Sequence, residues 1–281
     1  MVPPIITLTT DFGTGDPYVA AMKGVILSIN PGALIVDISH EVRPQAIEQG
    51  SFLLAAALPY FPTGAIHVAV VDPGVGSERR GLAVATAEAT FIGPDNGILS
   101  AALPDDLRAH AASPASPLPL PNGFRAVSLE NERYLHRPVS STLHGRDVFA
   151  PAAAHLSRGV RLEGLGPPLH SILALPPLRA QRQPDGSLQG RVVYIDRFGN
   201  LITDLRADDL PDAKAGAEAG EIVVEIAGQK VRGLRRAYHE GEGLIAYIGS
   251  AGYLEIALAG GSAAAALEAD IATAVRLHRS R

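Results

Sequence analysis

Acidic, basic and imidazole side chains follow directly after three strand-like runs in the first half of the chain. The three segments are Thr9 to Asp16, Asp37 to His40 and Asp72 to Arg80. In an open α/β sheet the ligand crevice lies outside the carboxyl ends of the strands, so these side chains are the first candidates for a site. Carboxylate, guanidinium and imidazole groups held together can bind a polar molecule and move a proton. Each segment alone is more simply explained as a helix cap or an ordered turn.

Two later segments have the same density of polar residues. Ser140 to Asp147 places His144 in a glycine-containing loop at the start of an expected helix, and Ile195 to Asn200 follows a strand in the second half. A satisfied structural histidine is the simpler explanation of His144 taken by itself. The candidate chemistry therefore depends on whether the separate segments act together.

Familiar cofactor and metal motifs are missing from the sequence. No Gly-x-Gly-x-x-Gly follows the first strand-like run, and no Gly-x4-Gly-Lys-Ser/Thr occurs. The nine histidines are scattered without a His-x-x-x-His pair, and neither a calcium loop nor a Gly-x-Ser-x-Gly elbow is present. The absence of cysteine excludes disulfides and thiolate nucleophiles. We expect polar side chains alone to carry the chemistry, without a metal or a bound cofactor.

Composition and charge limit the classes of partner. The net charge of −5 is dispersed along the chain, which argues against nucleic acid and anionic membranes as partners. The N-terminus has no basic leader, and no apolar run approaches the roughly 18–20 residues of a membrane span. The sequence therefore predicts a cytoplasmic protein with a small-molecule ligand.

The elements that must position the first three segments alternate between strands and helices. Strand-like runs at Ile5 to Leu8, Leu34 to Ile38 and Ile66 to Val71 are separated by helical patterns that open at Asp16-Pro17 and near Pro44. This order predicts an α/β N-terminal domain with a mostly parallel, helix-covered sheet.

The pattern changes after a stretch rich in proline and polar residues. The length of 281 residues exceeds one typical domain of about 100–200 residues, and this stretch is the best place for a linker. The short β-like runs that follow predict a smaller all-β C-terminal domain. The expected division is an α/β domain over 1–178, a linker over 179–189 and a β-rich domain over 190–281.

Taken together, the polar segments form an ordered series that covers nearly the whole chain. The series runs Thr10-Asp11-Phe12-Gly13, Asp16 to Gly24, Ile38-Ser39-His40, Val71 to Gly76, Pro94-Asp95-Asn96-Gly97, His144 to Asp147, Asp196 to Asn200 and Ser250 to Leu254. In register, these motifs resemble the S-adenosyl-L-methionine hydroxide adenosyltransferase family, whose relatives include fluorinating and chlorinating enzymes.

The resemblance implies a hydrolase that takes S-adenosyl-L-methionine as its substrate and needs no cofactor. Water would attack the 5′ carbon of the ribose, with release of adenosine and L-methionine. The catalytic triad of the family falls on Asp72, Arg79 and His144. Arg80 is adjacent, and the choice of Arg79 depends on its seven-residue offset from Asp72.

The resemblance also implies how the substrate is held. Asp11 is similar to the carboxylate that accepts both ribose hydroxyls, and Asp196 to the partner of the methionine ammonium group. Asn200 is similar to the residue that reads the adenine edge, and Ser250 to one that holds the amino-acid end. The family forms a homotrimer in which the substrate lies between the N-terminal domain of one subunit and the β domain of its neighbour.

Two other functions stay open. A halide-dependent adenosyltransferase would use the same substrate, and Gly145 resembles the small residue at the halide pocket of the chlorinating form. That form has a tyrosine at the position of Asp72 and lacks the triad. A non-catalytic sensor of adenosine or S-adenosyl-L-methionine would need Asp11, Asp196 and Asn200 but not the triad.

Overall fold

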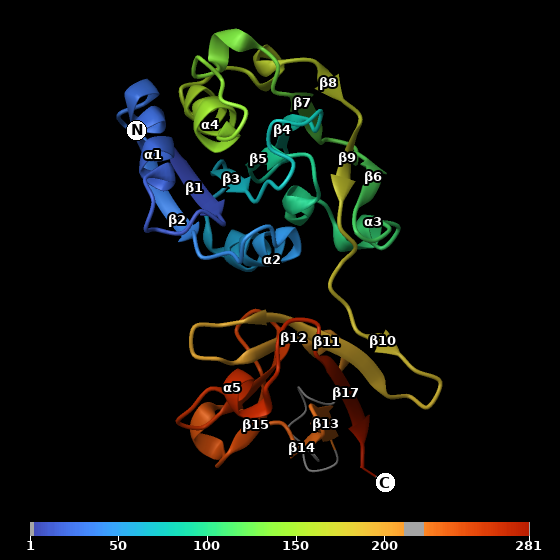
Figure 1. Cartoon of the computed structure of the whole chain (residues 1–281). Coiled ribbons are helices and arrows are strands. Elements are labelled where there is room, and N and C mark those ends of the chain that lie inside the picture. The colour runs from blue at the N-terminus through green and yellow to red at the C-terminus, as the bar shows by residue number, and fades with distance from the viewer. Residues whose placement is uncertain (1–2, 211–221, 281) are drawn as a thin grey trace. The chain divides into compact units, whose positions relative to one another are not determined.

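The computed structural model describes residues 3–210 and 222–280. The chain divides into two compact units, Met1–Pro177 and Leu178–Arg281 (Figure 1). No helix among these residues is long and apolar enough to cross a membrane.

The first unit is built on a seven-stranded sheet in the order β2-β1-β3-β5-β4-β7-β8. The pairs β1–β2, β1–β3 and β3–β5 are parallel, and the pairs β4–β5, β4–β7 and β7–β8 are antiparallel. A separate two-stranded sheet joins β6 to β9. The strands are β1 (Ile5–Thr10), β2 (Leu34–Ser39), β3 (Ile66–Val70), β4 (Gly81–Ala85), β5 (Thr90–Pro94), β6 (Ser116–Pro119), β7 (Arg125–Ser128), β8 (Pro168–Leu169) and β9 (Ser171–Ala174).

The expectation of a mostly parallel, helix-covered sheet is wrong. The sheet is mixed, because β4 and β5 form a hairpin whose turn is closed by a hydrogen bond from Thr86 N to Ala89 O. A turn this short permits only antiparallel pairing, whereas parallel neighbours need a crossover of a dozen or more residues. Helices are few and mostly short: α1 (Tyr18–Ile29), α2 (Ile47–Ala57), α3 (Asp105–Arg108), α4 (Ala150–Ser157), the π-turn η4 (Gly145–Phe149) and the 3₁₀ turns η1 (Leu58–Tyr60), η2 (Ile98–Ala102), η3 (Glu132–Tyr134) and η5 (Leu162–Leu165).

Two apolar clusters cover the two faces of this sheet. Side chains of β3 alternate between them, since Val68 and Val70 pack with α1 and α4, while Ala69 packs with α2 and η2. This is the period of two expected for a strand that is buried on both faces. The residues that leave the C-terminal end of β3 are therefore held between two packed layers.

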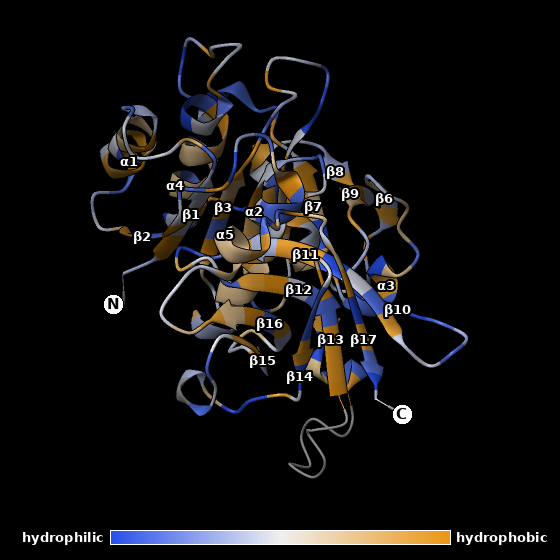
Figure 2. Ribbon diagram, turned by 60° about the horizontal axis from the view of Figure 1, so that its bottom comes forward, coloured by the Kyte–Doolittle hydropathy of each residue, from blue (hydrophilic) through white to orange (hydrophobic). Residues whose placement is uncertain are grey.

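The second unit is a sheet of antiparallel strands in the order β14-β13-β17-β11-β12-β16-β15, with β10 paired to β11. An isolated bridge between Arg235 and Tyr247 links the segment after β14 to β15, so the sheet nearly closes into a barrel. β13 is buried at four of its five positions, and Figure 2 shows it almost entirely in the hydrophobic colour. The elements are β10 (Gln181–Arg182), β11 (Leu188–Ile195), β12 (Leu201–Arg206), η6 (Ala207–Asp209), β13 (Ile222–Ile226), β14 (Gln229–Arg232), η9 (Tyr238–Glu240), β15 (Leu244–Ile248), β16 (Tyr253–Leu258), α5 (Ala263–Leu267) and β17 (Ala274–Arg279).

Candidate active site

An aspartate–arginine pair closes the loop between β3 and β4. Arg79 Nε donates to Asp72 Oδ1 at 2.9 Å, and Arg79 Nη2 donates to Asp72 Oδ2. The side chains are largely buried, at 5% exposed for Asp72 and 12% for Arg79. The guanidinium also lies over the ring of Phe149, with Cζ 5.4 Å from the ring centroid. A two-point contact of this kind fixes the plane of both charged groups.

Two glycines allow the 72–80 loop to fold tightly. A Cβ on Gly74 would lie 3.3 Å from Arg79 Cγ. Gly76 has a φ of +79°, and a Cβ there would collide with the carbonyl oxygen of Ser141. A larger residue at Gly76 would therefore push this loop away from the segment that carries His144.

His144 extends the contact to a third residue. Its Nδ1 lies 2.7 Å from Arg79 Nη2. Because a guanidinium only donates, Nδ1 must accept, and the neutral ring then carries its proton on Nε2. Burial lowers the pKa of His144 below 6.5, and the positive charge of Arg79 lowers it further, against the opposing charges of Asp72 and Asp147. The neutral imidazole is thus the form that fits this site.

The backbone after His144 makes a π-type turn over Gly145–Phe149 before α4 begins. Widened turns of this kind recur at functional sites. The buried Asp147 anchors the turn by accepting hydrogen bonds from Ser140 N at 2.8 Å and Arg146 Nε at 2.6 Å. Burial alone would raise the pKa of Asp147, but these hydrogen bonds and the Arg146 charge hold it below its usual value. The ionised carboxylate thereby fixes the loop that presents His144.

Arg80 lies apart from this group. Its Nε donates to Asp95 Oδ2 at 3.0 Å, and its Nη2 contacts the same oxygen. The other carboxylate oxygen of Asp95 accepts from Leu173 N at 2.7 Å. Arg79 and not Arg80 is therefore the arginine that contacts Asp72 and His144.

Asp11 lies at the C-terminal end of β1, the strand next to β3. Thr10 pairs with Val70 in parallel register, so Asp11 and Asp72 leave the sheet at the same edge. The carboxylate of Asp11 accepts a hydrogen bond from Gln45 N at 2.8 Å. The strand order thus places a second aspartate on the side of the sheet where the triad lies.

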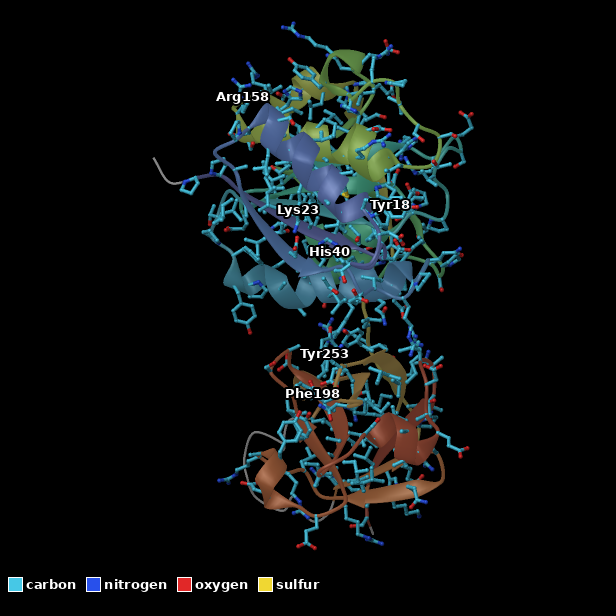
Figure 3. All side chains as sticks on the ribbon, turned by 60° about the vertical axis from the view of Figure 1, so that its left-hand side comes forward. Tyr18, Lys23, His40, Arg158, Phe198 and Tyr253 are labelled. Carbon is cyan, nitrogen blue, oxygen red and sulfur yellow. The ribbon has the colours of Figure 1, made fainter. Side chains whose placement is uncertain are left out.

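A buried histidine supports the loop that carries Asp11. His40 Nδ1 lies 2.8 Å from Thr10 Oγ1, and His40 O accepts from Gly13 N at 2.8 Å. Beside it, Asp37 contacts both His40 Nε2 at 3.0 Å and Lys23 Nζ at 2.5 Å; Figure 3 labels Lys23 on α1 and His40 close to it. Burial would raise the pKa of Asp37, but Lys23 and His40 outweigh it and lower that pKa.

The second unit contains a tight acidic turn at the end of β11. Asp196 Oδ1 accepts from Phe198 N and Asn200 N at 2.9 Å each, and Asp196 Oδ2 accepts from Asn200 Nδ2 at 2.8 Å. Phe198, at the tip, is 77% exposed (Figure 3). Ser250 is exposed in the turn between β15 and β16, which is closed by Gly249 N donating to Tyr253 O at 2.9 Å.

The structure therefore joins Asp72, Arg79 and His144 directly and places Asp11 at the same sheet edge. Asp196, Asn200 and Ser250 belong to the other unit. Sequence reasoning did not single out Asp147 and Phe149 as supports of the triad, although both lie within five residues of His144 and Asp147 closes the His144 to Asp147 motif. Among the described residues, no group of three or more histidine, aspartate and glutamate side chains could hold a metal ion.

Known protein families match both units of the chain. The family model of the SAM hydroxide adenosyltransferase N-terminal domain matches residues 6–166, and the family model of the C-terminal domain matches residues 190–276. A crystal structure of an uncharacterized conserved protein from Thermotoga maritima superposes with a TM-score of 0.83 at 31% identity, covering 99% of this chain and 100% of that one.

Three curated relatives extend the comparison. An (R)-S-adenosyl-L-methionine hydrolase from Thermus thermophilus is 42% identical, with 95% of this chain and 97% of the relative covered. A protein of the same name from Salinispora arenicola is 36% identical, with 93% and 92% covered. A fluorinase from Actinopolyspora mzabensis is more distant, at 27% identity over 76% of this chain and 75% of its own.

Proposed function

Because the chain belongs to the SAM hydroxide adenosyltransferase family, we infer that it is an enzyme that hydrolyses S-adenosyl-L-methionine to adenosine and L-methionine. The observation that carries the inference is the direct contact of Arg79 with both Asp72 and His144. A protein that only senses the molecule would have no need for this buried charged group.

In this reaction the nucleophile needs catalytic assistance and the leaving group does not. Displacement at the 5′ carbon expels methionine as a neutral thioether, so the leaving group needs no proton. Water must be held in line with the breaking carbon–sulfur bond and must lose a proton as the new carbon–oxygen bond forms. Positioned acid–base groups accelerate such a step by roughly 10²–10⁴-fold.

Each member of the triad has a distinct role in this proposal. The Arg79 cation stabilises the hydroxide character that develops on the water. Asp72 holds Arg79 at two points and is the carboxylate that can take the proton. The Nδ1 of His144 is occupied by Arg79, so its Nε2–H is the group left to orient the water oxygen. The positive sulfonium draws the negative nucleophile toward the carbon.

The binding residues hold the two ends of the substrate, which aligns the reacting carbon. We assign Asp11 to the ribose hydroxyls, Asn200 to the adenine edge, Asp196 to the methionine ammonium group and Ser250 to the amino-acid end. Asp196 already accepts three hydrogen bonds from its own turn, so its carboxylate is rigid before the substrate arrives. We further propose a homotrimer in which a neighbouring subunit completes each site. Location in the cytoplasm stays a prediction from the sequence.

The rival halide-dependent reaction would need room for an anion near Gly145. An added Cβ on Gly145 would lie 3.1 Å from both Met22 Sδ and the ring of Phe12, so this side of the glycine is already packed. Asp72 also adds a negative charge within contact of Arg79. Both features favour water over a halide as the nucleophile.

The test is to incubate the purified chain with S-adenosyl-L-methionine, with and without chloride, and to separate the products by chromatography. The name of the relatives specifies the (R) form, so both sulfonium epimers are supplied separately. Adenosine and methionine in equal amounts, unaffected by chloride, support the proposal. Formation of 5′-chloro-5′-deoxyadenosine would replace it with the halide reaction, and tight binding without turnover would replace it with a sensor.

A further inference from the structure

A chain of hydrogen bonds runs through the second unit away from Asn200. Asn200 Nδ2 lies 3.0 Å from Tyr238 Oη, Tyr238 Oη lies 2.5 Å from Tyr247 Oη, and Tyr247 Oη donates to Glu255 Oε2 at 2.6 Å. The three residues beyond Asn200 come from η9, β15 and β16, and none of them belongs to the triad or to the binding residues assigned above.

The sheet fixes the geometry of this chain. Tyr247 and Glu255 are direct cross-strand partners in the antiparallel β15–β16 pair, so their side chains lie on the same face. Glu255 also pairs with Ile202 of β12, the strand that begins directly after Asn200. A Cβ on Gly249 would overlap the carboxylate of Glu255, so the glycine makes room for the acid. The rings of Tyr238 and Tyr247 pack with centroids 4.8 Å apart.

The carboxylates at the two ends of the chain set its direction. Tyr247 Oη donates to Glu255 Oε2 and is therefore left to accept from Tyr238. Burial raises the pKa of Glu255, and the hydrogen bond from Tyr247 opposes that shift by stabilising the ionised form. Tyr238 then offers a lone pair to Asn200, whose second amide proton goes to Asp196 Oδ2 at 2.8 Å. Burial raises the pKa of Tyr247, and its hydrogen bond to Glu255 raises it further, which keeps the hydroxyl proton in place.

This direction leaves one atom of the Asn200 side chain for a ligand. Both amide protons are committed, and among the described residues nothing donates to its Oδ1. Asn200 is 4% exposed, so rotation of the amide would bring Oδ1 against the Asp196 carboxylate. The free group is therefore a fixed acceptor, which requires a donor on the ligand.

We propose that Tyr247 and Glu255 are positioning residues that hold the Asn200 amide with its oxygen toward the base, so that the site selects a 6-amino purine over a 6-oxo purine. The inference rests on the proposed function, because it assumes that Asn200 reads the base. The 6-amino group of adenine donates a hydrogen bond to Oδ1, whereas the 6-oxo group of hypoxanthine would face it with a second acceptor. Such a mismatch costs about 10–100-fold in selectivity.

The variants Tyr247→Phe and Glu255→Gln change which groups donate and which accept in the chain of hydrogen bonds. Both substitutions alter the shape of the side chain only slightly. Without Tyr247 Oη, the Tyr238 hydroxyl has no acceptor along the chain and can donate to Asn200 instead. The amide of Glu255→Gln can donate to Tyr247 and reverse the chain. Glu225→Gln is the matched control, because Glu225 on β13 contacts Lys230 and His278 and lies outside the chain of hydrogen bonds. Circular dichroism and melting temperature establish that each variant is folded.

The experiment compares kcat/KM for S-adenosyl-L-methionine with that for its deaminated analogue, S-inosyl-L-methionine. We expect the unmodified chain and Glu225→Gln to prefer the amino substrate by about 10–100-fold. The preference should fall by about tenfold in Tyr247→Phe and Glu255→Gln, through KM and not kcat. An equal loss on both substrates, with the preference intact, would overturn the proposal.

A binding measurement separates this inference from the proposed function. Calorimetry with adenosine and inosine needs no turnover, so the preference of Asn200 can be measured even if the chain does not hydrolyse S-adenosyl-L-methionine. A preference for adenosine over inosine that both Tyr247→Phe and Glu255→Gln lose supports the positioning role of the chain of hydrogen bonds. The same preference in the unmodified protein, these two variants and Glu225→Gln would contradict it, whatever the hydrolysis assay gives.

Discussion

Arg79 Nη2 lies 2.7 Å from Nδ1 of His144, a residue 65 positions further along the chain. The contact fixes the imidazole as a neutral acceptor toward Arg79 and leaves Nε2–H as its free donor. Asp72 holds the other side of the same guanidinium. Three charged or titratable groups are thus tied into one arrangement, and single substitutions can separate their contributions.

Arg79→Lys should lower kcat by about 10²–10³-fold, because a lysine cannot make the two-point contact with Asp72 and reach His144 as well. Arg80→Lys is the matched control, since Arg80 contacts Asp95 and lies apart from the triad. Steady-state kinetics of the two variants on S-adenosyl-L-methionine decide the matter. Equal losses in both would remove the distinction between the neighbouring arginines.

Asp72→Asn should lower kcat by roughly 10²–10⁴-fold and leave the dissociation constant of the substrate nearly unchanged. The amide keeps the shape of the carboxylate but cannot take the proton or balance the charge of Arg79. Calorimetric binding beside single-turnover hydrolysis measures the two effects separately. Retained turnover in this variant would exclude Asp72 from the mechanism.

The pH dependence of kcat/KM should show the ionisation of His144. Burial and then Arg79 lower its pKa below 6.5, and protonation would place a second N–H against the Arg79 donor. We expect kcat/KM to be independent of this group above pH 6.5 and to fall as the pH drops through the lowered pKa. His144→Gln should lose this acid limb together with most of its activity. A limb centred above pH 6.5 in the unmodified enzyme would contradict the assignment.

His67 should make the folded state sensitive to mild acid. It is 1% exposed on β3, lies 2.8 Å from Thr7 Oγ1 and packs near the rings of Phe61 and Phe91, and burial lowers its pKa to about 4. The unfolded chain binds a proton at His67 near pH 6.5, whereas the folded chain does so only near pH 4. The neutral, buried His67 therefore contributes its full stability above pH 6.5, and this contribution is lost as the pH falls toward 4.

Between pH 7 and pH 5 the loss from His67 amounts to about 2 kcal/mol. Urea unfolding at the two pH values measures it, and His67→Leu serves as the reference because it has no titrating group at this position. The fall in unfolding free energy should be smaller in the variant by that amount. Identical pH dependence in both proteins would mean that His67 takes up its proton at the same pH in the folded and the unfolded chain, which would contradict the lowered pKa.

The family resemblance pointed to Asp72, Arg79 and His144, but the sequence did not predict their geometry. Asp72 and His144 stood out because each lies in a short motif that joins a strand or helix end to glycine. Adjacent arginines carry no such signal, and the choice between them depends on side-chain directions that follow only once β4 is known to begin at Gly81. The contact of Ser141 with Gly76, which brings the two loops together, joins segments far apart in the chain.

Local sequence patterns could not predict the mixed sheet or the hydrogen-bond chain that starts at Asn200, because both depend on how strands pair. The pairing direction of β4 and β5 depends on the tight turn between them and not on their composition. Tyr238, Tyr247 and Glu255 come from three elements and meet only through the register of β15 with β16. Period-two alternation predicts which face a residue takes but not which residue lies opposite.

The most direct test of the central claim is hydrolysis in water enriched in oxygen-18, with mass spectrometry of both products. Attack by water at the ribose carbon predicts one heavy oxygen in the 5′-hydroxyl of adenosine and none in methionine, with the label lost along with turnover in Asp72→Asn. Adenosine without the label, label in methionine, or a 5′-halogenated product in place of adenosine would contradict the account.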